Sequence, residues 1–275
     1  MRFTAACIQS TATPDLRHDL AVLATMIREA ASRGASFVAT PEYCAGLDTR
    51  DGKMFPVAHA EADHPALPVF QDLAKDLRIW LLIGSVGVKA PDGRIFNRSF
   101  MLSPEGTILA RYDKVHLFDI DLGEGRSYRE SATIAPGSTA VITPCAGGLL
   151  GLSICYDIRF PHLYRSYAQA GAEMLAAPAA FTRVTGRAHW HVLQRARAIE
   201  NAAYVISPGQ CGTLAGGAEC YGHSLIVDPW GVVLADGGEE PGIVMSEIDL
   251  AKVAETRRRI PSLSHDRPFT LTTRT

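Results

Sequence analysis

The 275-residue sequence lacks the short cysteine and histidine motifs that usually mark metal centres. Its cysteines are scattered without a CxxC pair, and its nine histidines include no HExxH. The "HWH" at 189–191 falls in an expected helix, where side chains two residues apart point in different directions. We therefore expect no structural zinc site, and free thiols that mostly fill the core. The cysteines are Cys7, Cys44, Cys145, Cys155, Cys211 and Cys220.

Long apolar runs and clusters of like charge are also missing. The longest apolar stretch, "IWLLIGSVGV" at 79–88, is far shorter than the roughly 20 residues of a membrane-spanning helix. The net charge is -2, without the basic stripe that would indicate nucleic acid. The amino-terminal "MRFTAACIQS" has no long apolar region typical of a cleavable signal. We expect a cytoplasmic protein that binds neither membranes nor nucleic acid.

Apolar strand-like runs alternate with amphipathic helical stretches along most of the chain, which is typical of a layered α/β domain. Expected strands include 2–10, 36–42, 79–88, 148–155 and 173–180, and expected helices include 14–32, 65–77 and 186–202. The segment 116–137 has little periodicity, so we predict a long surface loop there. With no linker or repeat visible, the chain 1–275 is expected to form one domain of two sheets with helices outside.

Four residues with charged or reactive side chains stand at expected strand ends or in loops, namely Glu42, Lys114, Glu130 and Cys155. Each has an ordinary explanation when taken alone. The three charged residues could be solvated at the surface, and the cysteine could be a small core residue. Together, however, the four match what the hydrolysis of an amide requires.

Amide hydrolysis by a thiol needs a base and a donor for the developing oxyanion. A free thiol is only about 3% ionised at pH 7, so a base must remove its proton. Glu42 could take this proton from Cys155 and later give it to a departing amine. Lys114 and the main-chain N–H of Tyr156 could stabilise the negative oxygen. Glu130 would hold the lysine in place.

Four segments resemble the Glu, Lys and Cys motifs of the nitrilase superfamily of carbon-nitrogen hydrolases, in the same order. They are "PEYC" (41–44), "RYDKVHLFDIDL" (111–122), "YRESATIAPG" (128–137) and "SICYDIRFP" (153–161). The resemblance extends over nearly the whole chain. It implies an αββα sandwich spanning 1–275 as a single carbon-nitrogen hydrolase domain, which pairs into an αββααββα homodimer or a higher oligomer.

The same resemblance implies a mechanism without a cofactor or a metal. Carried over by motif, Glu42 is the general base, Lys114 the oxyanion stabiliser, Cys155 the nucleophile and Glu130 the second glutamate. The sequence "CYDIRFP" after the nucleophile is similar to the Nit amidase branch, whereas true nitrilases tend to have Trp and then Glu there.

The branch implies a small carboxylated amide as substrate. Deaminated glutathione, in a metabolite-repair role, is the first expectation. The alternatives are an ω-amidase acting on α-ketoglutaramate or α-ketosuccinamate, a hydrolase of N-carbamoyl amino acids and, from another class, a non-enzymatic scaffold. The loop "TLAGGAEC" at 213–220 has small residues where the glutathione-type relatives tend to carry charges, which leaves the acyl portion open.

A substrate carboxylate calls for a cation, and Arg159 is our first candidate because Arg grips carboxylates with two parallel hydrogen bonds. A helix-surface role is its alternative. Phe181 and Thr182, at the end of an expected strand, are the predicted pocket walls. The remaining candidates for shaping the cavity are Tyr43, His116 and Phe118, while Cys211 in "GQCG" is interpreted as a packing or interface residue.

Overall fold

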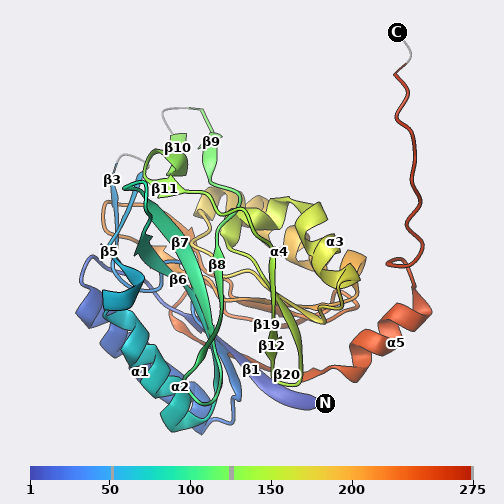
Figure 1. Cartoon of the computed structure of the whole chain (residues 1–275), viewed down its shortest axis with the longest axis horizontal. Coiled ribbons are helices and arrows are strands. Elements are labelled where there is room, and N and C mark those ends of the chain that lie inside the picture. The colour runs from blue at the N-terminus through green and yellow to red at the C-terminus, as the bar shows by residue number, and fades with distance from the viewer. Residues whose placement is uncertain (51–52, 124–126, 274–275) are drawn as a thin grey trace.

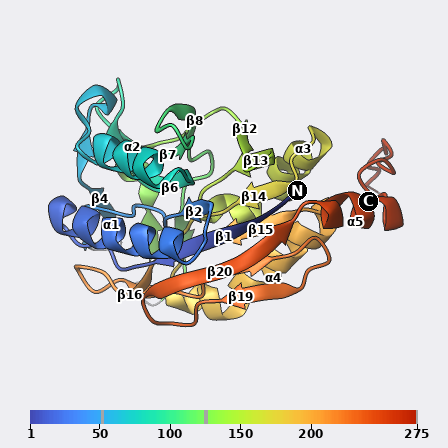
Figure 2. The ribbon, with the colours of Figure 1, turned by 90° about the horizontal axis from the view of Figure 1, so that it is seen from below.

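The computed structural model describes residues 1–50, 53–123 and 127–273. Its first strand, β1 (Arg2–Gln9), already shows how the layers form. Ala5 and Cys7 lie in the core between two sheets, whereas Ala6 and Ile8 lie in a second core beneath helices. Successive side chains of a strand point to opposite faces. Because β1 is apolar on both faces, it is covered on both, and a helix–sheet–sheet–helix stack results (Figures 1 and 2).

The first sheet has the order β11-β7-β6-β2-β1-β20, with β8 beside β7 and β5 beside β6. The strands β1, β2 and β6 run parallel at its centre. Helices α1 (Leu16–Ser32) and α2 (Ala66–Leu77) cover its outer face (Figure 1). Besides β1, its strands are β2 (Phe37–Ala39), β5 (Ala58–His59), β6 (Trp80–Lys89), β7 (Ile95–Leu102), β8 (Ile108–Asp113), β11 (Ile134–Ala135) and β20 (Gly242–Asp249).

The second sheet has the order β12-β13-β14-β15-β18-β19, and β13, β14 and β15 are parallel. Helices α3 (Pro161–Gln169) and α4 (Arg183–Asn201) pack on its outer face, and α5 (Ala251–Arg259) follows the first sheet's edge strand β20. The strands are β12 (Val141–Cys145), β13 (Gly148–Leu152), β14 (Met174–Ala176), β15 (Tyr204–Ser207), β18 (Leu225–Val227) and β19 (Val233–Asp236).

The predicted long loop at 116–137 is wrong in part, because the described residues of that segment contain short ordered pieces. Strand β9 (Asp119–Asp121) pairs with β10 (Ser127–Arg129), and a 3₁₀ turn, η2 (Glu130–Ala132), leads into β11. These pieces are too short to show a period in the sequence. Residues 124–126 of the predicted loop lie outside the described part.

Further short elements surround the two sheets. The hairpins pair β3 (Leu47–Arg50) with β4 (Lys53–Pro56) and β16 (Cys211–Thr213) with β17 (Glu219–Tyr221), and 3₁₀ turns lie at η1 (Glu61–Asp63) and η3 (Cys155–Arg159). Among the described residues, no helix is both long and apolar enough to span a membrane.

Two predicted strands end earlier than expected, and both corrections concern the site. The strand expected at 148–155 stops at Leu152, because the side chain of Asp157 takes up the N–H of Ile154 at 2.8 Å. The strand expected at 173–180 stops at Ala176. The segments that follow these strands, and those that follow β2 and β8, meet at one end of the sandwich.

Candidate active site

Glu42 lies in a tightly held turn after β2. This turn passes so close to β6 that a Cβ atom on Gly84 would lie 1.9 Å from the carbonyl oxygen of Thr40. Only glycine, which has no Cβ, permits this approach. Gln210 Nε2 donates hydrogen bonds to the carbonyl oxygens of Glu42 (2.9 Å) and Tyr43 (2.8 Å). The turn thus holds the Glu42 carboxylate in one direction inside the protein.

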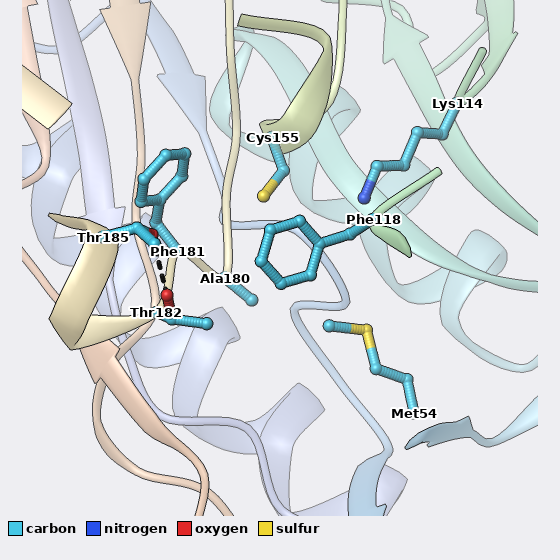
Figure 3. A pocket seen from close by; sticks show the side chains of 8 residues that line it. All are labelled: Met54, Lys114, Phe118, Cys155, Ala180, Phe181, Thr182 and Thr185. Carbon is cyan, nitrogen blue, oxygen red and sulfur yellow. Dashed lines mark hydrogen bonds between the residues drawn. The ribbon is translucent and has the colours of Figure 1, made fainter. Parts of the chain in front are cut away.

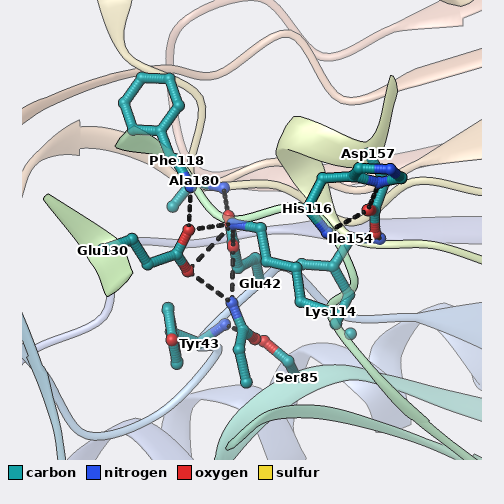
Figure 4. Close-up of polar contacts among 12 residues, drawn as sticks. Glu42, Tyr43, Ser85, Lys114, His116, Phe118, Glu130, Ile154, Asp157 and Ala180 are labelled. Atoms are coloured by element: carbon teal, nitrogen blue, oxygen red, sulfur yellow. Dashed lines mark hydrogen bonds and ion pairs between the residues drawn. The ribbon is translucent and has the colours of Figure 1, made fainter. Parts of the chain in front are cut away.

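Lys114 follows β8 and places its ammonium group between two carboxylates (Figure 4). Its Nζ lies 2.8 Å from Glu42 Oε1, and 2.9 and 3.1 Å from the two carboxylate oxygens of Glu130. The exposed fractions are 0% for Glu42 and Lys114 and 3% for Glu130. The alternative of three solvated surface charges is therefore wrong, and the structure brings these residues together as a buried ion cluster.

Asn97 is a member of this cluster that our sequence reasoning missed. Its Nδ2 donates to Glu42 Oε1 at 2.8 Å and to Glu130 Oε1 at 3.3 Å, and the residue is fully buried. Main-chain N–H groups complete the set, from Ala180 to Glu42 Oε2 (2.7 Å) and from Phe118 to Glu130 Oε2 (2.6 Å). The one available signal was a polar residue in "IFNRSF", the start of an expected strand.

Cys155 opens the turn η3 and lies beside the ion cluster. Its φ angle is +50°, in the left-handed region, and its main-chain N–H donates to the carbonyl oxygen of Pro178 at 2.8 Å. In Figure 3 its sulfur points into the space between Phe118 and Phe181. The ammonium group of Lys114 lies on the side of the sulfur away from Phe181. Cys155 is only 6% exposed, and Phe118 and Phe181 line the pocket beside it.

Asp157 is the second residue that the sequence reasoning missed, and it ties Cys155 to the strand that carries Lys114. Its Oδ2 accepts from Ile154 N (2.8 Å) and from the hydroxyl of Tyr112 (2.7 Å). Its Oδ1 accepts from His116 N (3.0 Å) and lies 2.7 Å from His116 Nδ1 (Figure 4). His116, a candidate for shaping the cavity, therefore acts on the turn behind Cys155.

Burial and charge together determine the protonation of the site. Burial and the neighbouring charge of Glu42 raise the pKa of the Cys155 thiol, against the opposing effect of Lys114, so the thiol is protonated at neutral pH. Burial would lower the pKa of Lys114, but the charges of Glu130 and Glu42 outweigh it and raise the pKa. Burial also raises the pKa of Glu130, opposed by Lys114.

A small pocket opens onto the thiol. Its volume is about 10 Å³, which is room for about one water molecule. The predicted wall residues Phe181 and Thr182 do line it, as does Phe118, a candidate for shaping the cavity. The complete lining is Met54, Lys114, Phe118, Cys155, Ala180, Phe181, Thr182 and Thr185.

Arg159 and Tyr156 lie next to this lining and not within it. The guanidinium carbon of Arg159 is 5.2 Å from the ring centre of Phe181 and 5.7 Å from that of Tyr156. Both terminal nitrogens of Arg159 lie 3.3 Å from His189 Nδ1. The structure thus places the predicted cation over a wall of the pocket, half-buried rather than on an open helix surface.

The other cysteines are free and buried, as predicted, and Cys155 is the one that lines the pocket. Cys211 lies on β16 against Thr11, and Cys145 ends β12 in the main core. Tyr43, another candidate for shaping the cavity, is fully buried in a small apolar cluster behind Glu42. Among the described residues, the side chains of His191, His223 and Asp236 could hold a metal ion, and none of them lines the pocket.

The arrangement suits acyl transfer to sulfur. A thiol faces a closed pocket, a carboxylate lies beside it, and an ammonium group points at the same space (Figure 3). A fixed positive charge in a dry site stabilises negative charge much better than water does. Groups of these three kinds can act as a nucleophile, a proton acceptor and an oxyanion donor.

Comparisons with known proteins agree with this chemistry. The family model described as carbon-nitrogen hydrolase matches residues 4–258. The deaminated glutathione amidase of Synechocystis sp. strain PCC 6803 is 41% identical over 268 residues, which cover 96% of this chain and 97% of that protein. Omega-amidase NIT2 of Homo sapiens is 40% identical over 237 residues, which cover 86% of this chain and 85% of that protein.

A solved structure shows the same architecture. The C. elegans NitFhit protein superimposes with a TM-score of 0.87 at 33% sequence identity, covering 97% of this chain. The match covers 65% of NitFhit, so this chain spans less than two thirds of that longer protein.

Proposed function

Because the chain belongs to the carbon-nitrogen hydrolase family, we propose that it is a cysteine amidase that acts on a small carboxylated amide, in the first place deaminated glutathione. The observation that supports the mechanism is that Cys155 and Lys114 line one pocket, while the Glu42 carboxylate behind it contacts both of them. A thiol that is protonated at rest needs a base, and Glu42 is the carboxylate beside it.

In the first half of the proposed reaction, the sulfur of Cys155 bonds to the carbonyl carbon of the amide while Glu42 takes the thiol proton. The carbonyl electron pair moves to the oxygen, where Lys114 and the main-chain N–H of Tyr156 stabilise the negative charge. When the intermediate collapses, the C–N bond breaks and Glu42 gives the proton to the leaving nitrogen. The products are an amine and a thioester on Cys155.

In the second half, water attacks the thioester. Glu42 takes a proton from the water, Lys114 again stabilises the oxyanion, and the carbon–sulfur bond breaks. The acid leaves and Cys155 regains its proton. Glu130 and Asn97 are positioning residues in this scheme, because they hold Lys114 and Glu42 by hydrogen bonds, whereas Glu42 is the carboxylate that contacts the thiol.

The pocket is so small that most of the substrate must bind outside it. Space for about one water molecule is too small for a whole substrate, so most of the substrate must lie beyond the pocket, past lining residues such as Phe181 and Thr182. Arg159 stands over Phe181 at this point, half-buried and with its charge available to a carboxylate. The base of the loop at 213–220 adjoins the same wall, since Thr182 bridges to Cys220.

Deaminated glutathione stands ahead of the ω-amidase substrates α-ketoglutaramate and α-ketosuccinamate because of the extent of the likeness. The identities are nearly equal, but the glutathione-type relative matches 96% of this chain and the ω-amidase 86%. We place N-carbamoyl amino acids lower, and a non-enzymatic scaffold lowest, since the acid, base and thiol groups are all present.

The test is the release of amine or ammonia from deaminated glutathione, α-ketoglutaramate, an N-carbamoyl amino acid and a simple nitrile. We expect deaminated glutathione to have the highest kcat/KM and Cys155→Ala to lose turnover while remaining folded. Arg159→Gln should raise KM by about 10-fold or more, as expected for the loss of a charged hydrogen bond, with a smaller effect on kcat. The matched control Arg187→Gln, on the exposed face of α4, should leave KM unchanged.

The results separate the parts of the proposal. Turnover that survives in Cys155→Ala would overturn the mechanism. A higher kcat/KM for α-ketoglutaramate than for deaminated glutathione would move the chain to the ω-amidase group while keeping the mechanism. An unchanged KM in Arg159→Gln would remove Arg159 from the binding site.

We also propose that the protein is cytoplasmic and acts as a homodimer. The dimer is supported by apolar side chains that α4 exposes, with exposed fractions of 53% for Val184, 68% for Val192 and 50% for Ile199. Light scattering on the purified full-length chain would give its mass in solution, and a monomer at micromolar concentration would contradict the dimer.

A further inference from the structure

Two histidines and an aspartate from distant parts of the chain meet at the surface, outside the pocket. His191 lies in the middle of α4, His223 just before β18, and Asp236 at the end of β19. His191 Nε2 lies 3.0 Å from Asp236 Oδ2, and His223 Nδ1 lies 2.8 Å from Asp236 Oδ1. One ligand atom from each residue lies within 4.8 Å of the others.

These spacings are close to those of a metal centre. A tetrahedral zinc ion binds imidazole nitrogen and carboxylate oxygen at about 2.0–2.2 Å, which puts its ligand atoms about 3.3 Å apart. The nitrogen–oxygen distances, 3.0 Å from His191 to Oδ2 and 2.8 Å from His223 to Oδ1 of Asp236, are shorter than that spacing, and the limit of 4.8 Å for one atom from each residue is longer. Small side-chain rotations would therefore open the cluster around an ion. The side chains are 34%, 21% and 34% exposed in the single chain, so the cluster is not sealed inside the fold.

The surrounding structure holds the His223 backbone in an unusual conformation. Its φ angle is +49°, in the left-handed region that costs energy for a residue with a side chain. Its N–H donates to the carbonyl oxygen of Gly238 at 2.6 Å, and its own carbonyl oxygen accepts from Trp190 Nε1 at 2.7 Å. Strained residues of this kind occur where the surroundings fix them, often at binding sites.

Neighbouring groups also orient the ligand side chains. The ring of Tyr221 stacks on His223, with centres 4.4 Å apart and planes 24° apart. Gly238 N donates to Asp236 Oδ1 at 2.9 Å, which supplies the kind of outer hydrogen bond that fixes a metal-binding carboxylate. His191 is carried by a long helix. The three side chains are thus positioned before any ion arrives.

We propose that His191, His223 and Asp236 form a binding site for a divalent transition-metal ion of the zinc class. Two imidazoles and one carboxylate are ligands that suit Zn²⁺, Co²⁺ or Ni²⁺. In the metal-bound form, Nε2 of His191 and Nδ1 of His223 bond to the ion without a proton, and each ring carries its proton on the nitrogen that faces away from Asp236. The ion joins α4 to the β18–β19 hairpin, replacing two hydrogen bonds with coordinate bonds.

The sequence predicts no zinc site at "HWH", because side chains two residues apart in a helix point in different directions. The proposed site uses only His191 of this motif, so that reason still holds. His189 and His191 do face different partners, Arg159 and Asp236 respectively. The other two proposed metal ligands, His223 and Asp236, lie more than thirty residues after His191 in the chain, so local spacing in the sequence does not reveal them. Trp190 also links the site to the pocket, because its ring lies 4.9 Å from that of Phe181.

The test is titration of the metal-free, full-length protein with Zn²⁺ by calorimetry, with Co²⁺ absorption as a report on the ligands. We expect one ion per chain, and at least a tenfold weaker affinity in His191→Ala and in Asp236→Asn. His223→Asn should weaken binding similarly, and Asn tolerates the left-handed backbone better than most residues. Zn²⁺ should raise the melting temperature of the wild type and not that of Asp236→Asn.

Two controls separate this site from other metal-binding groups. His18→Ala removes an exposed histidine from α1, and Cys155→Ala removes the pocket thiol, so both should bind Zn²⁺ as the wild type does. The proposal is overturned if the wild type binds no Zn²⁺, if His191→Ala and Asp236→Asn bind as tightly as the wild type, or if Cys155→Ala abolishes binding. None of these outcomes depends on amidase activity.

Discussion

Lys114 carries its ammonium group on a side chain that is shielded from bulk solvent. Its 0% exposure would be unfavourable for an isolated charge, since removing an ion from water costs several kcal/mol in a protein. Glu42 and Glu130 compensate with three contacts of 2.8 to 3.1 Å. When all three groups are ionised the cluster has a net charge of -1, so the lysine is also what keeps the two carboxylates from repelling each other.

Replacing Lys114 and replacing Glu130 should therefore affect stability very differently. Lys114→Met leaves two buried carboxylates without a cation, and we expect a loss of about 3–5 kcal/mol in the free energy of unfolding. Glu130→Gln keeps the shape and removes one of two like charges, but one buried donor loses its acceptor, so we expect a smaller loss of about 1–3 kcal/mol. Urea unfolding at pH 7.5 measures both.

Measuring the turnover of these two variants tests their roles in the reaction. Both should lose turnover, because Lys114 is the proposed oxyanion donor and Glu130 positions it. A Glu130→Gln protein that is as active as the wild type would show that one carboxylate suffices to position Lys114. Equal destabilisation by the two substitutions would contradict the picture of a single cation balancing two anions.

Among the elements, the turn η3 has the most direct bearing on the proposed chemistry. It holds Cys155 at a φ of +50°, a conformation that residues with side chains seldom adopt. Asp157 supports it by accepting hydrogen bonds from Ile154 N and Tyr112 on one oxygen and from His116 N on the other. The turn thus depends on an anion with several donors around it.

Asp157→Asn should loosen this turn without removing any proposed catalytic group. An amide has one acceptor oxygen where the carboxylate has two, so at least one buried donor loses its partner. We expect kcat to fall by about 10- to 100-fold, in line with about 1.5–3 kcal/mol for hydrogen bonds to a charged group, with KM within about threefold of wild type. Steady-state kinetics on the preferred substrate give both constants.

Tyr112→Phe is the matched control for Asp157→Asn. It removes one donor to the same carboxylate and leaves the contacts to Ile154 and His116 in place. Its kcat should fall by no more than about 10-fold, as for one ordinary hydrogen bond. If Asp157→Asn retained full kcat, the turn would not need the carboxylate; if it raised KM alone, Asp157 would act on binding instead.

The elements also show which parts of the structure the sequence could predict. Strand β1 and helix α1 were predicted to within a few residues because each presents a long, regular pattern of apolar side chains. The αββα layering and the family followed from motifs in the correct order. Periodicity could not detect β9 and β10, which are only three residues long each.

The partly predicted site has a similar explanation. Glu42, Lys114 and Cys155 were expected to converge because each is part of a motif, and the structure places them together. Asn97 and Asp157 were missed because their importance lies in contacts with residues 55 and 45 positions away along the chain, Glu42 and Tyr112. Such contacts appear only once the chain is folded.

The molecule as a whole carries six free thiols that are all buried. Burial raises the pKa of each of them, to about 12 for Cys44. An unfolded cysteine titrates near 8.5. Above that pH the unfolded chain loses protons that the folded chain keeps, so a rise in pH draws the equilibrium toward the unfolded state.

Stability should therefore be nearly constant from pH 7 to 8 and fall steeply above about pH 9. Each buried thiol contributes a loss of about 1.4 kcal/mol per pH unit in this window. The five thiols whose pKa is raised furthest, all except Cys211, would together consume a typical stability of about 5–15 kcal/mol within two pH units. Urea unfolding at pH 7.5, 8.5 and 9.5 gives the slope directly.

Removing one thiol outside the pocket tests the origin of this slope. Cys145→Ala should reduce the slope by about one proton, or about 1.4 kcal/mol per pH unit, whatever its effect at neutral pH. The same free energy of unfolding at pH 7.5 and 9.5 in the wild type would rule out the buried thiols as an alkaline weakness.

The ion cluster has one more consequence, for how this protein is assayed. Glu42 meets Lys114 across 72 positions of the chain and Ala180 across 138, and both sheets contribute to the contacts. No fragment or partly folded form holds all of these groups in place. Catalytic turnover is therefore a stringent quality check on any preparation of this protein, because only molecules in which the two sheets are packed together have a complete site.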